Sequence, residues 1–128
     1  MNQAFFVIIG GGTGTFLRWL IYKNSLTWLT IFSVIPLGTF LANILGSFFL
    51  GFLYLKQQNS NLHDWQWYLL ATGFCGGLTT FSTLMLEIVQ VYQKTSMLMA
   101  VAYAAFSLMT GVICLWSGMK CAENFSLF

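Results

Sequence analysis

The string GFCGGLTTFST at residues 73–83 holds the densest set of groups in this chain that could bind an ion. Each of its three glycines costs a helix about 1 kcal/mol relative to alanine, and the threonines and serine that follow are mediocre helix formers. We therefore expect a helix break within this string. A break frees backbone carbonyls, which suit a cation, and it creates a new helix start with hydroxyls, which suits an anion.

Other polar side chains recur at helical spacing in two further segments, so that each set shares one helix face. These sets are Thr39, Asn43 and Ser47 in one segment, and Tyr103, Ser107 and Thr110 in the other. Burying a polar group within an apolar segment costs free energy, so such groups are candidates for function. The amide of Asn43 needs partners, and both a pathway role and a packing role stay open for it. The positive ring edge of Phe81 can meet an anion, with simple packing as the alternative.

Only two charged residues lie well inside apolar segments, Arg18 and Glu87. Arg18 is close to the end of its segment and can extend its guanidinium toward the membrane surface. We expect structural roles for both residues, as an ion pair or a helix cap.

The composition identifies the protein class. Of the 128 residues, 58% are hydrophobic and only 6% are charged, against about 25% charged residues in soluble domains. Five Lys and Arg residues with no basic patch argue against a nucleic-acid partner. The chain is therefore predicted to be an all-α integral membrane protein that partners a lipid membrane, with its three cysteines as packing residues.

The positions of the charges divide the chain into four candidate spans, because a spanning helix needs about 20 apolar residues. The spans are predicted at about residues 5–22, 36–55, 65–92 and 97–119, within one domain of residues 1–128. Pro36 suits the first turn of the second span. Residues 26–35 are too few to span and are expected at the membrane interface. The third span is longer than necessary, which fits an interrupted helix.

The positive charges give almost no preference for one orientation. With four spans, Lys56 and Lys120 fall on one side of the membrane, and Arg18, Lys23 and Lys94 fall on the other. The positive-inside rule requires an imbalance. We therefore expect insertion in both orientations and an antiparallel dual-topology homodimer. The alternative is a single orientation set by other signals.

Taken together, these segments resemble the Fluc/CrcB family of fluoride channels. The resemblance rests on Gly10–Gly14 with Arg18, on the string at residues 38–51, on the string at residues 73–83, and on Tyr103 with Ser107. It implies an antiparallel dimer whose broken third helices hold a structural sodium ion (Na+) through the backbone carbonyls of Gly76 and Thr79. It also implies two fluoride pathways lined by Asn43, Phe81, Ser82, Thr83, Tyr103 and Ser107, with Thr39 nearby.

The implied function is passive, fluoride-selective export from the cytoplasm through the cell inner membrane, without enzymatic activity. Where the family usually carries a second phenylalanine, this chain has Leu84. The alternative function is a small dual-topology, proton-coupled multidrug exporter. Such an exporter needs a membrane-embedded carboxylate, and the first span contains no Asp or Glu.

Overall fold

A computed structural model describes residues 2–28, 37–59 and 61–125, and its secondary structure there is entirely helical. The elements are α1 (Gln3–Trp28), α2 (Leu37–Gln58), α3 (Asp64–Gln66), η1 (Trp67–Cys75), α4 (Gly76–Leu78), α5 (Phe81–Lys94) and α6 (Met97–Phe125). Four segments are long and apolar enough to cross a membrane, namely Gln3–Ser25, Leu37–Gln58, Asp64–Lys94 and Met97–Phe125. The prediction of an all-α, multi-pass membrane protein is confirmed.

Two details of the predicted spans fall at the edge of the described residues. Pro36, the predicted start of the second span, lies outside them. Of the predicted interfacial segment at residues 26–35, the part up to Trp28 continues α1, and the rest also lies outside them.

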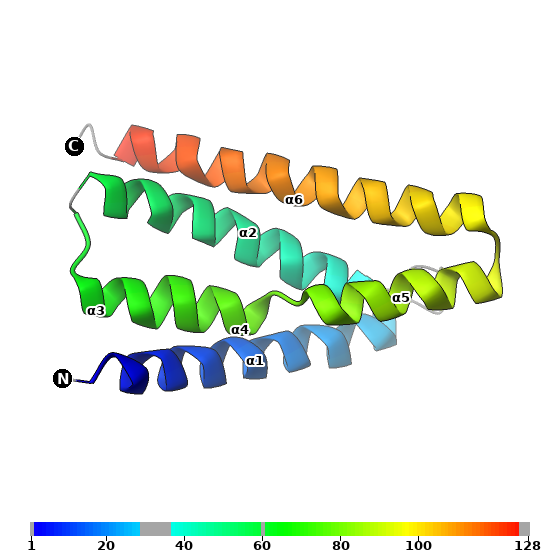
Figure 1. Ribbon diagram of the computed structural model, residues 1–128, viewed down its shortest axis with the longest axis horizontal. Helices are drawn as coiled ribbons and strands as arrows, with labels where there is room; N and C mark the ends of the chain where they lie inside the picture. Colours follow the sequence, from blue (N-terminus) through cyan, green and yellow to red (C-terminus); the bar gives the residue numbers. More distant parts are fainter. Residues whose placement is uncertain (1, 29–36, 60, 126–128) are drawn as a thin grey trace.

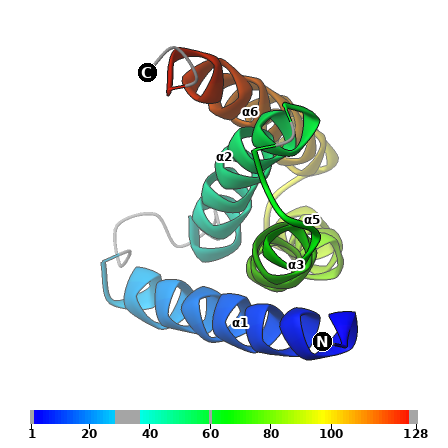
Figure 2. The ribbon, with the colours of Figure 1, turned by 90° about the vertical axis from the view of Figure 1, so that its left-hand side faces the viewer.

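The third span lies between α1 on one side and α2 with α6 on the other, as Figures 1 and 2 show. Successive spans alternate in direction, and the start of α1 lies at the same end of the bundle as the end of α6 (Figure 1). The first half of the third span, η1 and α4, packs on α1, whereas its second half, α5, packs on α6. The third span therefore changes its packing partner part-way along.

Glycines bring α1 and η1 into backbone contact. A Cβ atom at Gly10 would meet the carbonyl of Leu69 and the amide of Phe74, and one at Gly73 would meet Gly10 in return. Small residues at such contacts let membrane helices approach closely. Gly51 on α2 and Gly118 on α6 make the same kind of backbone contact between their helices.

The third span changes helix type before it is interrupted. The segment η1 is a π-helix, a rare form that is frequently found at functional sites. After α4, Thr79 (φ −80°, ψ 154°) and Thr80 (φ −149°, ψ 120°) are extended. The hydroxyl of Thr80 then accepts a hydrogen bond from Thr83 N (3.3 Å) and caps α5.

Lysines at both ends of the bundle lie over aromatic rings. The Nζ of Lys23 is 5.1 Å from the ring centre of Trp19 at one end, and at the other end Lys56 lies over Phe52 (5.7 Å). Lys120, also at that second end, lies 5.9 Å from the ring centre of Trp116. Amphipathic side chains of this kind favour the membrane interface.

Candidate functional site

Asn43 on α2 pairs with both backbone groups of Thr80 at the interruption. Its Oδ1 accepts a hydrogen bond from Thr80 N (2.7 Å), and its Nδ2 donates to Thr80 O (3.2 Å). In a continuous helix, Thr80 N would instead donate to the carbonyl of Gly76, four residues earlier. The side chain of Asn43 thus satisfies an amide that the interruption would leave without a partner.

Two side chains of α1 hold carbonyls on the other side of the interruption. The Nη1 of Arg18 donates to Thr79 O (3.2 Å), and the hydroxyl of Thr15 donates to Gly77 O (3.4 Å). Backbone groups away from regular helix are tolerated at membrane depth only where protein or water satisfies them. Residues from α1 and α2 together provide this satisfaction.

Hydroxyls cluster at the start of α5. Thr80 Oγ1 donates to Thr83 Oγ1 (3.1 Å) and lies 3.3 Å from Ser82 Oγ. The helix start adds free N–H groups and a partial positive charge. The cluster therefore offers neutral donors and a favourable field to an anion.

A cavity of about 330 Å³ adjoins the interruption between α2, α5 and α6. It brings together three of the residues predicted for the ion pathway, Asn43, Phe81 and Ser107, with Thr79 and Thr80 alongside. Leu84 also lines it and is 4% exposed. Phe81, in contrast, is 69% exposed on the single chain, so most of its side chain is not covered by its own protomer.

A second cavity, of about 350 Å³, lies on the α1 side of the same interruption. It is lined by Arg18 with Thr15, Thr39, Thr80 and Thr83, among others. Thr80 borders both cavities. The two polar regions therefore meet at this extended residue.

Glu87 is buried, at 4% exposure, and is bound by two hydroxyls. Thr39 Oγ1 donates to its Oε1 (2.5 Å), and the phenol of Tyr103 donates to its Oε2 (2.9 Å). In the described part of the chain the ion pair is Lys120–Glu123, and neither Arg18 nor Glu87 forms one. Glu87 is therefore held by hydrogen bonds rather than by a cation. The hydroxyl protons of Thr39 and Tyr103 are both donated to its carboxylate.

Comparison with known proteins shows which family this chain belongs to. The family described as "CrcB-like protein, Camphor Resistance (CrcB)" matches residues 5–119, which include every element of the site. The chain belongs to the CrcB family. The predicted resemblance is thereby confirmed.

Curated relatives of this CrcB chain align over nearly its whole length. A protein of Flavobacterium psychrophilum named fluoride-specific ion channel FluC is 35% identical over 97% of this chain and 99% of its own length. One of the same name from Azobacteroides pseudotrichonymphae is 39% identical, over 98% and 99%. An Escherichia coli protein, again named fluoride-specific ion channel FluC, is 43% identical over 69% of this chain and 68% of its own.

The predicted site residues of this CrcB chain divide into three neighbouring groups. The cavity toward α6 contains Asn43, Phe81 and Ser107, the α5 start contains Ser82 and Thr83, and the Glu87 cluster contains Thr39 and Tyr103. Gly76 is exposed on the protomer. Sequence reasoning gave Thr80 and Thr15 no individual role. Thr80 stood within the polar string, but nothing in the sequence distinguished Thr15.

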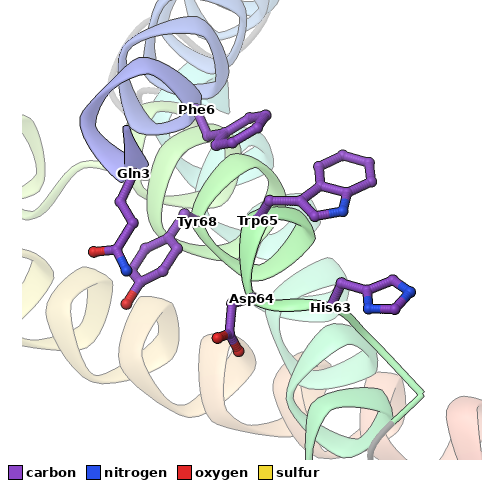
Figure 3. Close-up of a pocket in the computed structure, with 6 residues that line it drawn as sticks. All are labelled: Gln3, Phe6, His63, Asp64, Trp65 and Tyr68. Carbon is purple, nitrogen blue, oxygen red and sulfur yellow. The ribbon is translucent and has the colours of Figure 1, made fainter. Parts of the chain in front are cut away.

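A larger cavity, of about 630 Å³, lies at the end of the bundle and contains none of the predicted pathway residues. Figure 3 shows its lining side chains, Gln3, Phe6, His63, Asp64, Trp65 and Tyr68, around the start of α3. The Phe6 and Trp65 rings are 5.5 Å apart, and Asp64 contributes an acidic group. A carboxylate with aromatic faces is poorly suited to an anion, so the interruption remains the candidate site of this CrcB chain.

Proposed function

We propose that this chain is a fluoride-specific ion channel through which fluoride passively leaves the cytoplasm, reducing its toxicity. The observation that carries this proposal is the alignment with proteins named fluoride-specific ion channel FluC, which extends over 97% of the chain. It is supported by the polar interruption, because all of the predicted pathway residues belong to it or to clusters close by. A channel requires no catalytic group.

The chemistry of the site suits a small, strongly hydrated anion. A selective pore must replace the water around the ion with donors at close range. The hydroxyls of Ser82, Thr83 and Ser107 and the amide of Asn43 are neutral donors, which release an anion more readily than fixed cations would. The ring edge of Phe81 adds a weak positive partner.

The functional unit we propose is an antiparallel, dual-topology homodimer in the cell inner membrane. Phe81 and Ser82 border the interruption yet are exposed on the single protomer, so a second copy would complete their surroundings. The lysines over aromatic rings at both ends of the bundle suit either orientation.

A structural sodium ion at the dimer centre is also part of the proposal. The Gly76 carbonyl lacks its usual helical donor, because Thr80 N donates to Asn43. A Cβ built on Gly76 meets no atom closer than Ala71 O at 4.0 Å, so a second chain could approach closely. The Thr79 carbonyl accepts from Arg18 and retains a second lone pair. Hard carbonyl oxygens of this kind suit a hard cation, which would add a positive field beside the anion pathway.

The multidrug exporter is not favoured. Its chemistry needs a carboxylate that a cationic drug can reach, and Glu87 is buried beneath Thr39 and Tyr103 in the protomer. No carboxylate other than Glu87 lies between Trp65 and Lys120.

The test is an efflux assay with the purified chain in liposomes. Vesicles should release fluoride when a potassium ionophore balances the charge, and should release little chloride. Ser107→Ala should slow the efflux about tenfold, on the order of one lost hydrogen bond. The matched control is Ser117→Ala, which removes an exposed hydroxyl on the same helix and should leave the rate unchanged. Efflux that depends on a proton gradient, or equal release of chloride, would contradict the proposal.

A further inference from the structure

We infer that Asn43 is a positioning residue whose carboxamide holds Thr80 extended and keeps the Thr80 amide away from the Gly76 carbonyl. Its contribution to ion permeation would then include the shape of the backbone, in addition to the donor that its amide offers to the ion. The consequence for sodium rests on the proposed function, whereas the pairing with Thr80 does not.

The pairing selects an extended backbone. With φ −149° and ψ 120°, Thr80 lies in the antiparallel β region. In an extended strand, the N–H and C=O of one residue point to the same side, so one partner can bind both, as in a hydrogen-bonded strand pair. The carboxamide of Asn43 supplies an acceptor at 2.7 Å and a donor at 3.2 Å for these two groups.

A helical Thr80 would not offer this arrangement. In a helix, the N–H points toward the amino end and the C=O toward the carboxyl end. One short carboxamide cannot reach both. The free energy of the two hydrogen bonds to Asn43 therefore favours the interrupted form over a continuous helix, so α2 adds to the preference that the glycines of the third span already provide.

The pairing also leaves the Gly76 carbonyl without its helical donor. Arg18 and Thr15 bind the carbonyls of Thr79 and Gly77, and Asn43 binds that of Thr80. The helical donor for Gly76 O is Thr80 N, which Asn43 holds. Loss of Asn43 would let Thr80 N return to Gly76 O and would weaken a cation site there.

The chain offers variants that separate the components of this role. Asn43→Leu removes both hydrogen-bonding groups at nearly constant size, and Asn43→Ala is a second variant should leucine prevent folding. Asn43→Asp retains an acceptor for Thr80 N but loses the donor to Thr80 O. The matched control is Ser47→Ala, one turn further along α2, where Ser47 lines the same cavity.

The decisive measurement is solid-state NMR of the full chain in lipid bilayers, with threonine labelled in 15N and 13C. In the unsubstituted chain we expect extended-type Cα and Cβ shifts for Thr80 and a protected amide. In Asn43→Leu or Asn43→Ala, these shifts should become helical, or the amide should exchange about tenfold faster. Asn43→Asp should exchange less than the leucine variant, and Ser47→Ala should match the unsubstituted chain. Unchanged shifts and exchange in both the leucine and alanine variants would overturn the inference.

A sodium titration then tests the consequence at Gly76. The 13C shift of its carbonyl should respond to sodium, and the midpoint should rise at least about tenfold in Asn43→Leu. This readout does not depend on fluoride transport. An unsubstituted chain that gives no sodium response would overturn the cation site while the Thr80 measurement still decides the role of Asn43.

Discussion

Glu87 provides the sharpest test of the energetics of the bundle. Its buried carboxylate accepts hydrogen bonds from Thr39 on α2 and Tyr103 on α6, and so connects three helices. Thr39→Val keeps the shape of the side chain and removes the hydroxyl. Because hydrogen bonds to charged groups contribute about 1.5–3 kcal/mol, we expect this variant to lose that amount from the free energy of unfolding.

The same substitution should cost less beside a neutral partner. In Glu87→Gln the carboxylate becomes an amide, and hydrogen bonds between neutral groups contribute about 0.5–1.5 kcal/mol. The cost of Thr39→Val should therefore fall by about 1 kcal/mol in the Glu87→Gln background. This difference is the coupling energy of a double-mutant cycle, which isolates the pair from other effects of each substitution.

The four chains of the cycle can be compared by reversible unfolding in lipid or mixed micelles. Thr110→Val is the matched control, because Thr110 is bonded only within its own helix, to Phe106 O (2.7 Å), among the contacts described. Its free energy of unfolding should change by no more than about 0.5 kcal/mol. Equal costs of Thr39→Val in both backgrounds would refute the charged hydrogen bond between Thr39 and Glu87.

Three further predictions follow from the packing and the charges. Gly10→Ala should destabilise the chain by about 1–3 kcal/mol, because its Cβ would meet the η1 backbone. Gly12→Ala has open space around its Cβ and should be neutral or stabilising by up to about 1 kcal/mol. Measuring the free energy of unfolding of the two variants side by side checks this. Gly76→Ala should leave helix content unchanged by circular dichroism while weakening dimer formation in a crosslinking assay, since its Cβ is free within the protomer. Reporter fusions at the carboxyl terminus should mark both sides of the membrane, and lysines added between Gln57 and Asn61 should drive one orientation and abolish efflux; full efflux from that single orientation would contradict the antiparallel dimer.

The four spans could be predicted because few residues carry charge and all of them except Arg18 and Glu87 lie near the span ends. The string in which a helix break was expected and the polar helix faces could also be predicted, because both depend on residue spacing along one helix. The partners that a side chain meets on other helices do not follow from this spacing. Thr39 and Tyr103 shared faces with other polar residues in the sequence, but their convergence on Glu87 depends on how three helices are rotated about their axes.

The pairing of Asn43 with Thr80 shows why the rest of the site needed a structure. It depends on two backbone torsions and on the rotation of α2, neither of which has a residue signature. The π-helical form of η1 is similarly invisible in sequence, because the shift to bonds five residues apart changes the register without changing the composition. Arg18 could be recognised as an intramembrane charge, but its carbonyl partner on Thr79 could not.

The change of packing partner along the third span has a mechanical consequence. A continuous helix behaves as a stiff rod, so turning one end turns the other. Here η1 and α4 are joined to α1 by backbone contacts, while α5 packs on α6. Two extended residues link these halves, and a twist of α5 is not passed to α4 by a helical ladder of hydrogen bonds. The two halves of the third span can therefore differ in rotation, each being packed on a different neighbour, and Asn43 of α2 binds the extended backbone that joins them.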